Sequence, residues 1–129
     1  MSKNQTGLSY LAVAVGGAVG GLGRLMFMES GGDSLGASAT SLLIVNVLGC
    51  ALLGAVASLG ERGFVASHQY GFLWRPALAT GVLGGFTSTS SLAVISEQLG
   101  GNHGALYAVF SAAAGLVVYS LVHGALTRR

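Results

Sequence analysis

Four long apolar stretches, joined by short polar connections, constrain this chain more than any other feature of its sequence. They run approximately over residues 8–28, 39–60, 72–96 and 105–126. Each is close to the roughly 20 residues that an α-helix needs to cross a bilayer. Strands of a membrane β-barrel are about ten residues long and alternate in polarity, unlike these continuous runs. The pattern predicts an all-α membrane protein in which residues 1–129 form a single domain of four transmembrane helices.

The scarcity of charge excludes several other classes of protein. Only 8% of the residues are charged, whereas soluble domains carry roughly 25%. The net charge of +2 is too small to indicate a nucleic-acid partner, and the lone Cys50 excludes both a disulfide within the chain and a zinc site built on cysteine. No set of nucleophile, base and acid residues is present, so we do not expect an enzyme.

Positively charged side chains predict the orientation in the bilayer. With four spans, the N-terminus, the second connection and the C-terminus lie on the same side of the membrane. The basic residues of that side are Lys3, Arg62, Arg75, Arg128 and Arg129. The first and third connections carry no Lys or Arg. Because cytoplasmic segments are enriched in these residues, we expect both termini in the cytoplasm.

The third span contains the most unusual local sequence, in which Gly84 and Gly85 precede five hydroxyl residues at 87–91. Adjacent glycines weaken a helix, and irregular backbone at membrane depth survives only when it is buried in protein or lines a wet cavity. We therefore expect the third helix to be broken near mid-membrane. Freed carbonyls at such a break can coordinate a cation, and freed amides and hydroxyls can face an anion. The alternative is that the hydroxyls bond to carbonyls of their own helix and merely soften it.

Polar or small residues also mark the second and fourth spans. Asn46 either forms a hydrogen bond that packs two helices together or is a donor that lines a pore. Gly49 lies on nearly the same face and would allow another helix to approach closely. In the fourth span a stripe of polar or small residues recurs at steps of four: Tyr107, Ser111, Gly115 and Tyr119. Helix packing accounts for this stripe as well as a polar pathway does. His123 extends the stripe towards the interface, where we expect a solvated histidine.

The first span has a glycine-rich face that ends in an arginine. Gly16, Gly17, Gly20 and Gly21 form two overlapping small-xxx-small pairs, which predict a surface for close helix packing. Arg24, near the outer end of the span, either snorkels to the interface or holds an anion vestibule or a loop.

In their order along the chain, these motifs resemble the small bacterial fluoride channels of the Fluc (CrcB) family. The first-span pattern is matched by Gly16, Gly17, Gly20 and Arg24; the second by Val45, Asn46, Gly49 and Gly54; the third by Gly81, Gly84, Gly85, Thr87 and Ser90; and the fourth by Tyr107 and Ser111. The resemblance covers all four spans. It implies an antiparallel dimer in the bacterial inner membrane that conducts fluoride passively out of the cytoplasm.

The resemblance also implies roles for individual residues. A structural sodium ion would lie at the dimer centre, held by the carbonyls of Gly84 and Thr87. Residues facing fluoride or lining the pore would be Asn46, Thr89, Ser90, Tyr107 and Ser111. Fluoride is costly to dehydrate, so a pore must offer polar hydrogens in exchange.

One departure from the family pattern affects the pore itself. The family's two pore phenylalanines, whose electropositive ring edges face the ion, fall on Thr89 and Leu92 here. An antiparallel homodimer also needs one sequence to insert both ways, whereas this chain is strongly biased to one orientation. We therefore favour a heterodimer in which a related antiparallel subunit supplies the phenylalanines.

Two other functions stay open at this point. The loss of both phenylalanines is compatible with a non-conducting structural or regulatory membrane subunit. Small multidrug-type transporters also have four short spans, but they depend on a membrane-embedded Glu. Glu29 and Glu97 lie at the ends of spans, and no Asp or Glu lies deep within one.

Overall fold

The computed structural model of this protein describes residues 3–61 and 71–128, and these ranges are almost entirely helical. The elements are α1 (Lys3–Glu29), α2 (Leu35–Glu61), α3 (Gly71–Arg75), the π-helix η1 (Pro76–Leu83), α4 (Gly84–Phe86), α5 (Thr89–Leu99) and α6 (Gly101–Thr127). The basic residues Arg62 and Arg129, used above to predict orientation, lie outside the described residues.

Four helical segments are long and apolar enough to cross a membrane: Asn4–Glu29, Leu35–Glu61, Leu73–Leu99 and Gly101–Thr127. This confirms the all-α architecture with four candidate spans. Most large apolar side chains of these helices are exposed, including Leu106 and Val109, each with 68% of its surface accessible. Such an apolar exterior suits lipid, which solvates these side chains as well as another helix would.

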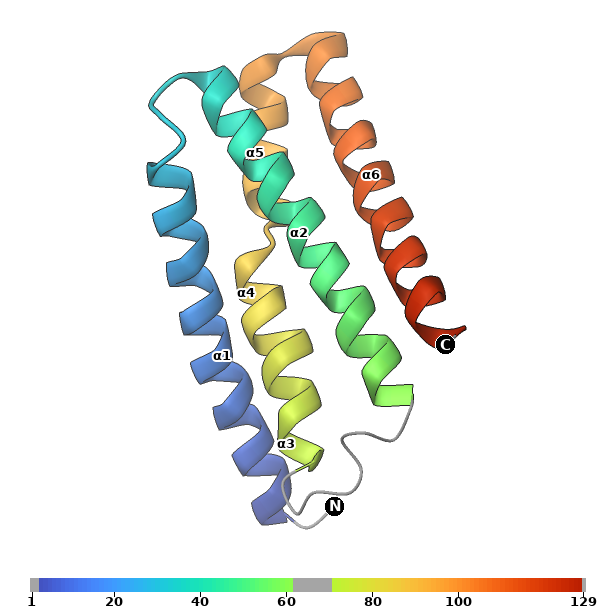
Figure 1. The fold of residues 1–129 in the computed structure, drawn as a ribbon. Coiled ribbons are helices and arrows are strands. Elements are labelled where there is room, and N and C mark those ends of the chain that lie inside the picture. Colours follow the sequence, from blue (N-terminus) through green and yellow to red (C-terminus); the bar gives the residue numbers. More distant parts are fainter. Residues whose placement is uncertain (1–2, 62–70, 129) are drawn as a thin grey trace.

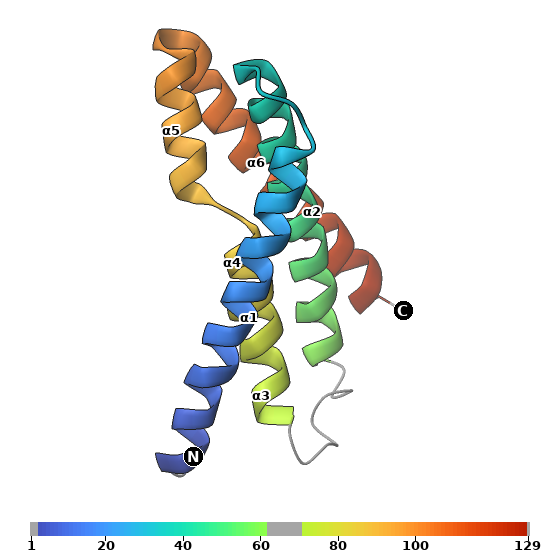
Figure 2. The same cartoon turned by 90° about the vertical axis from the view of Figure 1, so that its left-hand side faces the viewer.

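The helices form a bundle in which the third span is built from several shorter pieces (Figure 1). The α1–α2 and α5–α6 connections lie together at one end of the bundle, and both termini lie towards the other end. Seen from the side, α5 leans away from the line of α4, and an extended segment joins the two (Figure 2). The most extensive packing is between α2 and α6, and between α1 and η1.

The packing of α1 against the third span depends on glycine. A Cβ added at Gly20 would collide with the carbonyl of Val82 and approach the amide of Phe86 at 2.8 Å. At Gly16 it would lie 2.5 Å from the carbonyl oxygen of Ala77. In contrast, a Cβ at Gly21 would meet nothing within 4 Å. The predicted close-packing face is confirmed, and it is the Gly16–Gly20 side of α1 that forms it.

The third span changes its backbone twice along its length. It begins as an α-helix, becomes a π-helix at Pro76 and returns to α-helical geometry at Gly84. A wider π turn suits this position because proline lacks the N–H that an α-helix needs and crowds the preceding turn. The helix then ends, and Thr87 (φ −76°, ψ 153°) and Ser88 (φ −146°, ψ 111°) are extended before α5 begins.

The irregular backbone therefore lies three residues after the glycine pair that was expected to weaken the helix. Gly84 is helical, with φ −65° and ψ −36°, and a Cβ at Gly85 would collide with the carbonyl of Gly17 on α1. Gly85 therefore serves close packing, because its missing side chain lets α1 lie directly against α4, whereas a Cβ at Gly84 would meet no atom of α1 within 4 Å. The change of direction instead occurs where hydroxyl side chains can bond to the released backbone groups.

A small buried cluster lies at the connection end of the bundle. Ala39 and Leu42 of α2 pack on Ile95 of α5 and have at most 8% of their surface exposed. Further apolar side chains from α1, α5 and α6 close around it, namely Met28, Leu92, Leu99 and Tyr107. This cluster fixes α5 against α2 beyond the extended segment.

Candidate functional site

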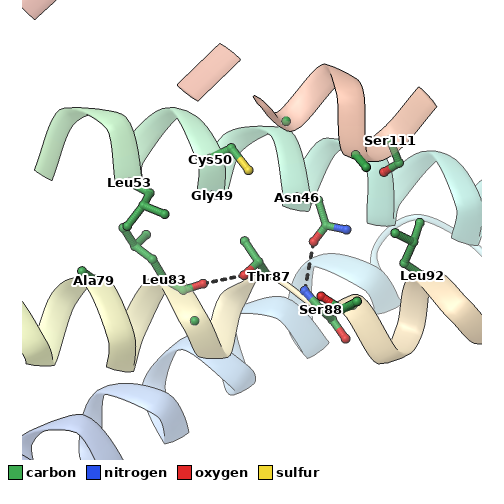
Figure 3. Close-up of a pocket in the computed structure, with 14 residues that line it drawn as sticks. Asn46, Gly49, Cys50, Leu53, Ala79, Leu83, Thr87, Ser88, Leu92 and Ser111 are labelled. Carbon is green, nitrogen blue, oxygen red and sulfur yellow. Dashed lines mark hydrogen bonds between the residues drawn. The ribbon is translucent and has the colours of Figure 1, made fainter. Parts of the chain in front are cut away.

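Asn46 on α2 holds the extended segment of the third span. Its side-chain oxygen Oδ1 accepts a hydrogen bond of 2.9 Å from the backbone N–H of Ser88 (Figure 3). Gly49 lies one turn further along α2, and a Cβ there would collide with the methyl group of Thr87. The expected close approach at Gly49 is thus confirmed, and the neighbour is the non-helical segment of the third span.

Three serine hydroxyls gather where α5 begins. Ser88 is the N-cap of α5, and its Oγ accepts a bond of 3.1 Å from the N–H of Ser91, as is typical of a helix start. The same Oγ lies 2.8 Å from Ser91 Oγ, to which it donates, and 3.2 Å from Ser90 Oγ. These serine hydroxyls bond to one another. Of the five hydroxyl residues, only Thr87 bonds to a carbonyl of its own helix, as the alternative interpretation expected: its Oγ1 donates to the Leu83 carbonyl at 2.9 Å.

These bonds divert two amides from the pattern of a continuing α-helix. The amide of Ser88 would bond to the carbonyl of Gly84, but it donates to Asn46. The amide of Ser91 would bond to the carbonyl of Thr87, but it donates to the Ser88 hydroxyl. The carbonyls of Gly84 and Thr87 therefore lose their usual helical donors, which leaves their lone pairs available to another partner.

A cavity of about 300 Å³ lies between α2, α6 and the interrupted third span (Figure 3). We call it the first cavity. Its lining residues are Asn46, Gly49, Cys50, Leu53, Ala79, Leu83, Gly84, Thr87, Ser88, Thr89, Leu92, Ser111, Ala112 and Gly115. The structure thus brings together Asn46, Gly84, Thr87, Thr89 and Ser111, which are five of the residues singled out in the sequence.

The first cavity is mostly apolar, and the few polar groups that line it are uncharged. Ser111 has only 2% of its surface exposed, and its Oγ has no hydrogen-bond partner among the described residues. Asn46 uses its oxygen for Ser88, and within residues 3–61 and 71–128 no bond engages its amide Nδ2. Among the residues that the structure describes, no Asp, Glu, Lys or Arg lines this cavity. The free hydrogens of Asn46 and Ser111 are therefore suited to an acceptor such as an anion.

Ser90 faces a different hollow, which we call the second cavity. It has a volume of about 350 Å³ and is lined by Met28, Ser38, Ser90, Ser91, Val94, Ile95 and Gln98. Thr89 and Leu92 line the first cavity while Ser90 and Ser91 line the second. The two cavities therefore lie against different faces of α5.

Of the residues expected at the pore, the ion site or the vestibule, Tyr107 and Arg24 line neither cavity. The hydroxyl of Tyr107 donates to the backbone carbonyl of Ala39 at 2.8 Å and thereby ties α6 to α2. Arg24 is half-buried on α1. A pore-facing role for Tyr107 and a vestibule role for Arg24 stay predictions.

The C-terminal part of the stripe of polar or small residues on α6 packs against α2. Gly115 faces Cys50, whose Sγ would lie 2.9 Å from a Cβ at that glycine. Tyr119 stacks on His123 with ring centroids 5.7 Å apart, and His123 Nε2 lies 3.2 Å from a carboxylate oxygen of Glu61. The histidine expected to be solvated is thus partly buried, with 27% of its side chain exposed, because it pairs across the helices.

Ser88 is the residue that the sequence interpretation underrated. It appeared only as one of five hydroxyls, yet it is 6% exposed and joins Asn46, Ser90 and Ser91 in a single network. A signal was present, because a serine just before a helix start is a preferred N-cap.

Comparison with known proteins gives the chain its relatives. A family described as "CrcB-like protein, Camphor Resistance (CrcB)" matches residues 11–125. The "Fluoride-specific ion channel FluC" from one strain of Thermus thermophilus is 41% identical over 114 residues, which cover 84% of this chain and 86% of the relative. The protein of the same name from Erythrobacter litoralis is 33% identical over 128 residues, covering 92% and 90%. The match to its namesake from Solibacter usitatus, 38% identical, spans 66% of that relative, just under two thirds of its length.

Proposed function

This chain belongs to the CrcB family, and from that membership we propose that it is a subunit of a fluoride channel that lets fluoride leave the cytoplasm passively. The observation that carries the proposal is the first cavity, where Asn46 Nδ2 and the buried Ser111 hydroxyl have no other partner among the described residues. Such neutral donors replace the hydration of an anion without binding it too tightly to leave. The relatives bear the name of ion channels, in agreement with the expectation that the chain is not an enzyme.

The channel is assembled, in this proposal, from two antiparallel subunits, with the extended residues Thr87 and Ser88 near mid-membrane. Asn46, which bonds to Ser88, lies about 16 Å along α2 from its first residue at about 1.5 Å per residue. That is close to half of a hydrocarbon core of about 30 Å. Non-helical backbone at this depth requires cover from protein or a wet cavity, and the first cavity meets this requirement.

A sodium ion at the dimer centre would be held by the carbonyls of Gly84 and Thr87. These are the two carbonyls whose usual helical donors are diverted, to Asn46 and to the Ser88 hydroxyl. Carbonyl oxygens are suitable ligands for a small hard cation. Among the described residues there is no cluster of three or more His, Cys, Asp or Glu side chains that could hold a metal instead. When bound, the ion would supply positive charge that holds the two copies of this segment together.

The partner is, we infer, a related chain of opposite orientation. Thr89 and Leu92 both line the first cavity, where the family has aromatic rings. Neither side chain offers an electropositive ring edge, and a cavity of about 300 Å³ far exceeds one dehydrated fluoride. Aromatic side chains from the partner would narrow this space and complete the pore.

The charge pattern supports insertion in the inner membrane with both termini in the cytoplasm. Arg75 and Arg128 belong to the end of the bundle that carries the termini. The opposite end carries the α1–α2 and α5–α6 connections, which contain no Lys or Arg. A cytoplasmic bias of this kind favours one orientation and leaves the inverse orientation to the partner.

Fluoride efflux from liposomes tests the proposal. The chain is reconstituted alone, and together with each related four-span protein from the same genome. We expect efflux above that of protein-free vesicles from a mixed pair and none from the chain alone. Robust efflux from the chain alone would refute the heterodimer but leave the channel. No efflux from any combination would instead favour a non-conducting structural subunit, the alternative that the loss of both phenylalanines suggests.

A further inference from the structure

The two cavities extend from the start of α5 towards opposite ends of the bundle. The first cavity reaches Leu53, which lies about 10 Å beyond Asn46 along α2 at about 1.5 Å per residue, towards the end that carries the termini. The second cavity reaches Gln98, about 12 Å beyond Ser90 along α5 by the same measure, towards the end that carries the connections. Together they cover most of the length of the bundle.

Ser88 connects the two cavities. Its buried side chain lines the first cavity, whereas its two hydroxyl partners, Ser90 and Ser91, line the second. The contacts are 3.2 Å to Ser90 Oγ and 2.8 Å to Ser91 Oγ. A hydroxyl network therefore passes from one face of α5 to the other through a single side chain.

The protons of this network can be counted. Each serine has one hydroxyl proton and can accept two bonds. Ser88 donates to Ser91, so the contact between Ser88 and Ser90 must use the proton of Ser90. The proton of Ser91 is then left without an acceptor among the described residues, next to the second cavity that Ser91 lines. If Ser88 turns its proton towards the first cavity, Ser91 loses a donor and Ser88 gains an acceptor in that cavity.

The far end of the second cavity carries two further donors. Ser38 of α2 and Gln98 of α5 both line it. In the part of the chain that the structure describes, no hydrogen bond engages either side chain. Gln98 is exposed and Ser38 half-buried, so both can exchange hydrogen bonds between water and an ion at the mouth of the cavity.

We propose that the anion crosses this chain through the two cavities in series, passing between them at the Ser88 hydroxyl and entering or leaving between Ser38 and Gln98. The inference rests on the proposed function and adds a route to it. The Ser88 hydroxyl offers its one proton to either cavity in turn, and the Ser91 proton receives the anion on the other side of α5. The side-chain amide of Gln98 then begins its rehydration.

Efflux of the conducting form, alone or paired, tests the route. Gln98→Leu and Ser91→Ala should each lower fluoride efflux about tenfold, the effect of losing about one hydrogen bond to an ion. Ser91→Thr keeps the hydroxyl and should restore efflux to nearly that of the unchanged protein. Asn102→Leu is the matched control for Gln98→Leu, because Asn102 is exposed at the same end and lines neither cavity. Unchanged efflux in both Gln98→Leu and Ser91→Ala would overturn the route.

Thiol labelling tests the same route without requiring conduction. In a Cys50→Ala background, Val94→Cys places a thiol in the second cavity, and Leu106→Cys places one at a similar depth on α6 outside both cavities. A charged, water-soluble thiol reagent should label Val94→Cys at least tenfold faster than Leu106→Cys, because a thiol in lipid remains protonated and unreactive. Equal rates would mean that the second cavity holds no water, which overturns the route whether or not the chain conducts fluoride.

Discussion

Glycine residues have different roles in two regions of this bundle: the contact between α1 and η1, and the region between α2, α6 and the extended segment of the third span. Along α1 and η1, the buried glycines Gly16 and Gly20 lack side chains, so that the two backbones lie in direct contact. Between α2, α6 and the extended segment, Gly49 likewise admits a neighbour, but the neighbour is a hydroxyl-bearing residue beside a cavity. The difference shows that glycine makes a rigid seam where it meets backbone, as Gly16 and Gly20 do, whereas Gly49 makes room for the methyl group of Thr87 beside the first cavity.

The largest expected effect tests the rigid seam. Gly20→Leu should abolish folding, because even a Cβ at this position would collide with the carbonyl of Val82. Backbone atoms cannot yield as a flexible side chain does, and overpacking by a single small group already costs about 1–3 kcal/mol. The measurement is the yield of monodisperse protein after purification in detergent.

Gly21→Leu is the matched control for the seam. A Cβ at Gly21 meets nothing within 4 Å, so this variant should be purified at a yield close to that of the unchanged chain. Equal losses of yield in both variants would show that α1 tolerates no added side chain on either face. The proposed difference between the Gly16–Gly20 side of α1 and the side of Gly21 would then be abandoned.

The next effect concerns the two aromatic side chains of the family pattern that are missing from the lining of the first cavity. The double variant Thr89→Phe with Leu92→Phe should give the chain reconstituted alone a fluoride efflux above that of protein-free vesicles, because the two rings supply the electropositive edges that the unchanged chain lacks. Both positions line the first cavity, so the rings have room there. Liposome efflux is the measurement, and no gain despite normal reconstitution would contradict the idea that these two positions limit conduction.

A smaller effect distinguishes two buried serines. Ser111→Ala removes an unpartnered hydroxyl from the first cavity and should lower fluoride efflux of the conducting form about fivefold, the effect of about 1 kcal/mol. Its thermal stability should be unchanged or slightly higher, because no hydrogen bond within the described residues is lost. Ser58→Ala serves as the control: Ser58 is fully buried, but its hydroxyl donates to the Ala55 carbonyl at 2.8 Å and lines neither cavity. If the two variants conduct equally, Ser111 has no part in the pathway.

The four-span architecture could be predicted from the sequence because it depends on length and apolarity alone. The glycine face of α1 could also be predicted from the sequence, since small residues at a spacing of four indicate close packing. Asn46 and Ser111 could be identified as lone polar groups in apolar spans, and they line the same cavity.

The position of the extended segment was harder to predict. The sequence predicted an interruption at Gly84, Gly85 and the hydroxyl run that follows them, but the propensity of the glycines is a weak guide where tertiary packing decides. Gly84 and Gly85 stay helical, with Gly85 packed against Gly17 of α1, and the bond from Ser88 to Asn46 draws the irregular backbone to the hydroxyl run. That bond joins residues far apart in the chain, so no local pattern reveals it. The same holds for Tyr107, whose partner on α2 is equally remote in sequence.

The central claim is that neutral donors in the first cavity carry fluoride, and Asn46→Asp tests it most directly. The carboxylate keeps an acceptor for the Ser88 amide, so the extended segment should hold, but it replaces the free N–H donors of Asn46 with negative charge. Fluoride efflux from liposomes is measured for the conducting form at about pH 8.5, well above the range in which a carboxyl group ordinarily titrates. We predict a loss of about a hundredfold with unchanged assembly, since a hydrogen bond to an ion contributes about 1.5–3 kcal/mol. Efflux equal to that of the unchanged protein would contradict the claim.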